Sequence, residues 1–168
     1  PLSSIVVRSI HVGFLMLLAF ALYPGWRGAA RARVPVIDWL FGLSAFILGL
    51  YHWVYETELI VRTGEPNTSD LVVGTLLVLL VFDASRRVMG PALPVMCALF
   101  LAYGLFGQYL PAGLATRGYG YDQIVSQLML GTEGILGIAT LVSSTYIYLF
   151  ILFGAFLEQA GMSQLFND

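Results

Sequence analysis

Five apolar runs dominate the hydrophobic pattern of this chain. The longest covers residues 135–157 and contains no charged side chain. At 1.5 Å per residue, a helix of that length crosses a bilayer core of about 30 Å. A second uncharged run covers 91–110, and three further candidates cover 5–23, 39–55 and 71–82. The pattern predicts an all-α fold: a polytopic transmembrane helical bundle of about five spans.

The run over 71–82 is short for a span, with only 12 residues, and by length alone it could be a buried or re-entrant segment. If its helix continues through Asp83 to Arg87, these two side chains lie four residues apart on one face and form an ion pair. We therefore expect the longer helix, with Asp70 as its N-terminal cap. In the preceding run, Gly42 and Gly49 recur near helical spacing with Ala45, which predicts close helix packing.

A different periodicity governs residues 121–130. The apolar side chains of this stretch share one helical face, and its polar side chains share the other. This pattern predicts one interfacial amphipathic helix at the membrane surface. The glycine-rich sequence GTEGILG follows at 131–137. Broken backbone at membrane depth is tolerated where it lines a cavity or packs against protein.

Composition supports a membrane protein and narrows the function. Apolar residues make up 58% of the chain and charged residues 11%, against about 25% charged in soluble domains. The net charge of −2 argues against a nucleic-acid partner, which would require a basic face. We find no zinc-ligand spacing, nucleophile elbow or phosphate-binding loop, so we expect no enzyme and no cofactor.

The basic residues, all arginine, predict the topology. The first and third loops contain five of them, and the second and fourth contain only Arg62 and Arg117. Under the positive-inside rule, the first and third loops are cytoplasmic. We expect an upstream helix and a longer chain, because this topology otherwise places the start of the sequence outside. The predicted cytoplasmic interface anchors are Arg27, Arg31, Arg33, Asp83, Arg86 and Arg87.

Candidate chemistry is sparse. Ser143, Ser144 and Thr145 interrupt the longest apolar run, and hydroxyl oxygens suit a hard cation such as Na⁺. The alternative is that they bond to another helix or to the carbonyl one turn back. Glu133 precedes the same run, either as a cation or proton ligand or as a charge favoured by the helix dipole. These four residues form the predicted ion or substrate pathway.

Two polar residues of the first run have simpler expected roles. Arg8 lies within one turn of the helix end, from which its side chain can extend to the interface. His11 lies deeper, and we expect it to face other helices and bond to a backbone carbonyl. A proton-relay role is the alternative.

Three ordered stretches carry a family resemblance: DLVVGTLLVLLVFDASRRVMGPALPVMCALFLAYGLFGQYLP, RGYGYDQIVSQLMLGTEGILGI and SSTYIYLFILFGAFLEQAG. Together they resemble the fused membrane permeases of tripartite ATP-independent periplasmic (TRAP) transporters, most closely the TAXI type. The resemblance covers roughly residues 5–168 and is strongest over 70–161.

This resemblance implies a division of the chain and a function. Residues 1–88 would be the last three helices of a small-subunit-like membrane domain, and 89–168 the start of the large, elevator-like transport domain. The implied activity is ion-gradient-driven uptake of organic acids, commonly with sodium and without ATP. The implied partners are an extracytoplasmic substrate-binding protein, the remainder of the permease chain and the lipid bilayer of the bacterial inner membrane. The alternative is a non-transporting membrane scaffold or assembly subunit.

Overall fold

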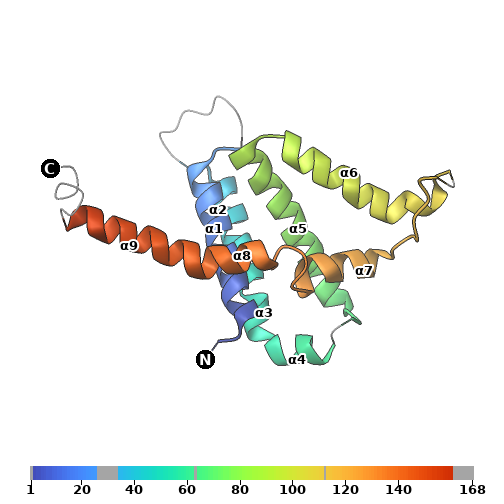
Figure 1. Ribbon diagram of the computed structural model, residues 1–168, viewed down its shortest axis with the longest axis horizontal. Helices are drawn as coiled ribbons and strands as arrows, with labels where there is room; N and C mark the ends of the chain where they lie inside the picture. The colour runs from blue at the N-terminus through green and yellow to red at the C-terminus, as the bar shows by residue number, and fades with distance from the viewer. Residues whose placement is uncertain (1, 26–33, 63, 112, 161–168) are drawn as a thin grey trace.

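A computed structural model describes residues 2–25, 34–62, 64–111 and 113–160. All regular elements in these ranges are helices, which confirms the predicted all-α class (Figure 1). The elements are α1 (Ser4–Leu22), α2 (Val36–Gly49), α3 (Tyr51–Val54), α4 (Glu56–Val61), α5 (Thr68–Met89), α6 (Ala92–Phe106), the 3₁₀ turn η1 (Gly107–Tyr109), α7 (Tyr121–Val125), the π-helix η2 (Ser126–Leu130), α8 (Ile138–Val142), the π-helix η3 (Ser143–Ile147) and α9 (Tyr148–Gln159).

Four stretches of helix within the described residues are long and apolar enough to cross a membrane. They are Ser4–Leu22, Val36–Val54, Ala92–Tyr109 and Ile138–Gln159. The helix α5 has 22 residues, and charged side chains lie in its first and last turns. The four stretches agree with a polytopic helical bundle, while a fifth span along α5 remains a prediction.

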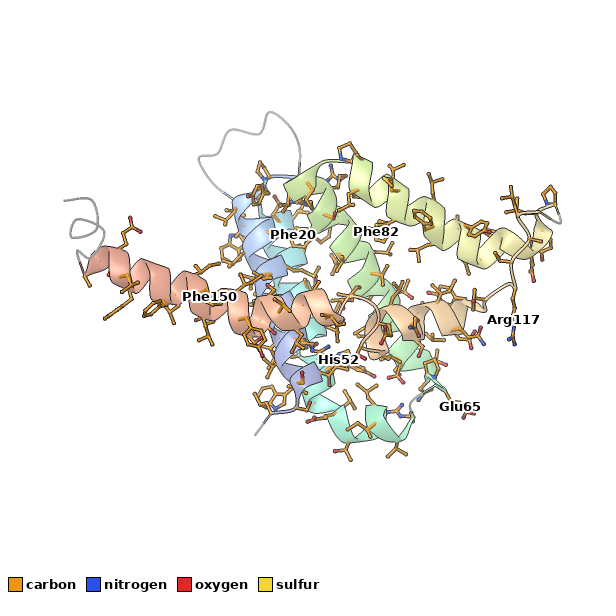
Figure 2. The ribbon with its side chains drawn as sticks, in the orientation of Figure 1. Phe20, His52, Glu65, Phe82, Arg117 and Phe150 are labelled. Atoms are coloured by element: carbon orange, nitrogen blue, oxygen red, sulfur yellow. The ribbon has the colours of Figure 1, made fainter. Side chains whose placement is uncertain are left out.

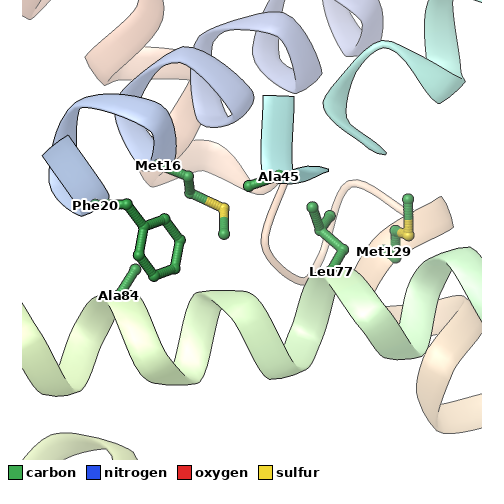
Figure 3. Close-up of a cluster of buried hydrophobic side chains, with 6 residues drawn as sticks. All are labelled: Met16, Phe20, Ala45, Leu77, Ala84 and Met129. Atoms are coloured by element: carbon green, nitrogen blue, oxygen red, sulfur yellow. The ribbon is translucent and has the colours of Figure 1, made fainter. Parts of the chain in front are cut away.

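The core lies where α1, α2 and α5 meet (Figure 1). Its buried side chains come from these three helices and from η2; they are Met16, Phe20, Ala45, Leu77, Ala84 and Met129 (Figure 3). Between α1 and α2 the backbones approach closely, because a Cβ added at Gly49 would lie 2.9 Å from the Cα of Gly13. Gly42, Ala45 and Gly49 are all buried, which confirms their predicted role in packing.

The helix α5 continues through the polar sequence that follows its apolar run, as predicted. The Arg87 Nε lies 2.8 Å from the Asp83 Oδ2, so the expected i,i+4 pair is formed. At the other end the cap differs from the prediction. Asn67 is the N-cap, and Asp70 is its capping-box partner, accepting a hydrogen bond from the Asn67 backbone N–H at 2.9 Å. Asn67 directly precedes the first helical residue, and from this position its side-chain oxygen accepts a hydrogen bond from the Thr68 backbone N–H.

The predicted amphipathic face over 121–130 is present. Val125 and Met129 are buried, whereas Asp122 and Gln127 are exposed. The apolar face packs against α5 at Gly74, where an added Cβ would lie 3.3 Å from the Met129 sulfur. The helix is therefore part of the protein core through this face.

The long helices α6 and α9 contribute no buried residue to the described structure. The helix α6 lies to one side of the bundle, and α9 extends away from it in the opposite direction (Figure 1). Their large apolar side chains are exposed, including Phe100 and Phe150 at 70% and 74%. Such surfaces are stable against lipid or another membrane helix, where apolar area need not be hidden from water.

Candidate functional site

The glycine-rich turn at residues 131–137 joins the π-helix η2 to α8, which continues into the second π-helix, η3. It closes on itself through backbone bonds, from Ile135 N to Leu128 O at 2.8 Å and from Gly137 N to Gly134 O at 3.0 Å. A Cβ added at Gly134 would overlap the Leu128 backbone. Backbone, and not a flexible side chain, fills that space, so the turn requires glycine there. The turn packs against protein, which is one of the two settings in which broken backbone next to a membrane helix is tolerated.

The turn is anchored to α1 by Arg8. The Arg8 Nη1 donates a hydrogen bond to the Leu136 carbonyl oxygen at 2.7 Å, and its Nε and Nη2 donate to the Ser4 hydroxyl. Leu136 is fully buried, and Arg8 is only 9% exposed. The expected extension of Arg8 to the membrane interface is therefore wrong. A buried carbonyl lies within reach of the guanidinium, and bonding to it satisfies both groups.

The three predicted hydroxyls begin η3, and the structure separates their roles. Ser143 faces α1, where its Oγ lies 3.0 Å from the His11 Nε2. Ser144 and Thr145 both donate to the Leu141 carbonyl, at 3.1 and 2.7 Å. Both bonding modes of the alternative interpretation thus occur, between helices for Ser143 and back along the helix for the other two.

His11 packs against other helices as expected, but its partner is the Ser143 hydroxyl and not a backbone carbonyl. Two residues earlier in α1, Ser9 forms a second serine–histidine pair, which joins α1 to α3. The Ser9 hydroxyl lies 3.2 Å from the His52 Nδ1 and donates to the Gly49 carbonyl at 2.5 Å. His52 is 2% exposed and lies near the centre of the molecule (Figure 2). Sequence analysis missed this pair, because nothing local relates positions 9 and 52.

Glu133 lies in the glycine-rich turn and is exposed. Within the described residues, no hydrogen bond or ion pair joins its carboxylate to the hydroxyls of η3. Nor do three or more His, Cys, Asp or Glu side chains of the described residues gather as metal ligands.

The predicted interface anchors on α5 lie in an ion cluster with α2. Arg87 Nη1 lies 2.7 Å from Asp38 Oδ1, and Asp83 bridges Arg87 and Arg86 at 2.8 and 2.7 Å. The Arg87 guanidinium also lies 4.6 Å from the centre of the Phe20 ring. The predicted anchors Arg27, Arg31 and Arg33 lie outside the described residues.

Asp38, the buried partner in this cluster, was not predicted from the sequence. An acidic residue in the first turn of an apolar helix was its only local signal. Side-chain exposures of 4% for Arg87 and 6% for Asp38 show that the pair is shielded from water. The cluster thus connects the first turn of α2 to the last turn of α5.

Comparison with known protein families identifies a match. Residues 76–168, more than half of the chain, match the family described as "Tripartite ATP-independent periplasmic transporter, DctM component". The matched part contains the glycine-rich turn and η3, whereas α1, which provides Arg8 and His11, precedes it. No curated protein matches the chain. No solved structure matches it either.

Proposed function

Because this chain belongs to the family of DctM components of tripartite ATP-independent periplasmic transporters, we propose that it takes part in ion-gradient-driven uptake of organic acids. Its class is that of a multi-pass membrane permease component, which is a transporter and not an enzyme class. The family match over residues 76–168 is the observation that carries the proposal. The proposed location is the bacterial inner membrane.

The proposed permease has two membrane domains within this sequence. Residues 1–88 form the small-subunit-like domain, and residues 89–168 begin the transport domain, as in a fused TAXI-type permease. Tight packing of α1, α2 and α5 supports a stable first domain. The uncovered surfaces of α6 and α9 suit contact with the bilayer and with the remainder of the permease chain. An extracytoplasmic binding protein delivers the substrate.

The proposed coupling ion is sodium, held near the start of η3. Ser143, Ser144 and Thr145 offer three hydroxyl oxygens, and Glu133 lies in the preceding turn. A π-helical segment shifts the backbone register, and such segments occur frequently at functional sites. Hydroxyl and carbonyl oxygens near broken helices are the ligands that sodium-coupled transporters use. The pairing of Ser143 with His11 would tie ion binding to the position of α1.

Uptake by the full-length permease tests this function. The protein is reconstituted in liposomes with its binding protein, and labelled organic acid is followed under a sodium gradient, a proton gradient or neither. We expect uptake only with the sodium gradient. The Ser143→Ala variant should raise the half-saturating sodium concentration, whereas Ser44→Ala, the same change at an α2 hydroxyl bonded to Phe41 O, should not. Absence of uptake under every gradient would favour the scaffold function.

A further inference from the structure

A cavity of about 620 Å³ lies between α6 and the segment that leads into α7 and η2. Phe100, Leu101 and Gly104 of α6 form one wall, and a Cβ added at Gly104 would lie 3.5 Å from the Ile124 Cδ1. The opposite wall contains the polar side chains of Arg117, Tyr119, Gln123 and Gln127, together with the apolar Ile124 and Leu128. Its volume lies in the range of pockets that hold small organic ligands.

Backbone hydrogen bonds build this cavity. After η1 the chain turns back, so that Thr116 N donates to Gly107 O of η1 at 3.2 Å and Tyr119 N donates to Gly104 O of α6 at 3.3 Å. Arg117 lies between Thr116 and Tyr119 in the sequence, so these two bonds fix the backbone on either side of it. Its side chain lines the cavity at the edge of the molecule (Figure 2). Main-chain hydrogen bonds therefore fix the position of the segment that carries Arg117 and Tyr119.

The charge of Arg117 is not neutralised within the described chain. The other described arginines, at positions 8, 62, 86 and 87, all donate to carboxylates, hydroxyls or carbonyls. Arg117 forms no such bond with a described residue and is exposed. No acidic side chain lines the cavity. A single positive charge beside uncharged polar side chains favours an anion.

The neighbouring groups favour a hydroxylated anion. Gln123 and Gln127 lie four residues apart on one helical face, and both line the cavity with Tyr119. The Gln123 Oε1 already accepts a hydrogen bond from Gly120 N at 3.2 Å, so its amide NH₂ is the group left to donate. Amide and phenol groups donate to and accept from hydroxyls, and a guanidinium binds a carboxylate with two parallel bonds.

We propose that this cavity is a binding site for a small hydroxylated carboxylate, held by Arg117 at its carboxylate and by Gln123, Gln127 and Tyr119 at its hydroxyls. The inference rests on the proposed function, because the ligand is of the organic acid class assigned to the transporter. The cavity lies at the end of α6 remote from Pro91. Under the predicted topology this end faces the binding protein, so the site would receive the substrate before it enters the membrane.

Binding measured without any ion gradient tests the site. Gluconate is titrated against the purified full-length permease, without binding protein, by isothermal calorimetry. Glucose tests the need for charge, and inorganic phosphate and phosphatidylglycerol vesicles test a phosphate ligand. We expect saturable gluconate binding, with an affinity at least about tenfold weaker in Arg117→Gln, since loss of a charge-assisted pair of bonds is worth about that factor. Arg117→Lys should bind with intermediate affinity.

The matched control is Asp122→Asn, a change at an exposed residue of α7 that does not line the cavity. It should bind gluconate as the wild type does. Equal gluconate affinity in wild type and Arg117→Gln, or no binding by the wild type, would overturn the inference. Arg117-dependent binding of phosphate or vesicles in preference to gluconate would overturn the carboxylate assignment. Because no gradient is used, a failure of driven uptake would count against the proposed function and leave this measurement valid.

Discussion

The buried pair between Asp38 and Arg87 provides the sharpest test of how this bundle is held together. It joins the first turn of α2 to the last turn of α5 at 2.7 Å, and both side chains are nearly inaccessible to solvent. Arg87 has further partners in Asp83, at 2.8 Å, and in the Tyr23 carbonyl, at 3.3 Å. Changing Asp38 therefore weakens the neutralisation of a buried charge without removing it.

The perturbation is Asp38→Asn, which keeps the size of the side chain and removes its charge. Removing one partner of a buried ion pair costs about 3–5 kcal/mol, because the remaining charge stays shielded from water. Asp83 still compensates Arg87, so we expect a loss at the lower end, about 3 kcal/mol. This corresponds to about a hundredfold shift toward the unfolded state, at 1.4 kcal/mol for each factor of ten.

The assay is reversible unfolding of the purified full-length permease in mixed micelles, with increasing sodium dodecyl sulfate and helix content as the signal. The control is the double variant Asp38→Leu/Arg87→Met, which removes both charges. Replacing both members of a buried pair with apolar side chains is often neutral or stabilising, so the double variant should be more stable than Asp38→Asn. The reasoning is refuted if Asp38→Asn lies within about 0.5 kcal/mol of the wild type, the range of ordinary surface changes.

Two further predictions concern the glycine-rich turn. Gly134→Ala should reduce both the folded yield and the uptake of the full-length permease, because the added methyl group overlaps the Leu128 backbone. Gly154→Ala is the control and should leave both unchanged, because a Cβ at that position has nothing within 4 Å. Equal behaviour of the two variants in size-exclusion yield and liposome uptake would contradict this prediction. Arg8→Met should destabilise the permease by about 1–3 kcal/mol in the same unfolding assay, because the buried Leu136 carbonyl loses its charged donor; an unchanged midpoint would show that the bond does not hold the turn.

The sequence alone determined the class of this protein and the course of its helices. Hydrophobic length and helical periodicity are local properties, so the apolar stretches that could span a membrane and the buried face of 121–130 could be predicted without a fold. The pair of Asp83 with Arg87 could be predicted for the same reason, since four residues along one helix set the spacing. Motifs carried the family assignment, which the match over residues 76–168 confirms.

Only the tertiary structure decided which polar groups meet. Arg8 could have extended to the interface, but packing places a buried carbonyl 128 positions later within its reach. His11 with Ser143, and Asp38 with Arg87, are likewise pairs between helices distant in sequence. Such partners depend on how each helix is rotated and at what depth it crosses its neighbour. Those quantities follow from the packing of small residues such as Gly49 against another backbone, and no local pattern contains them.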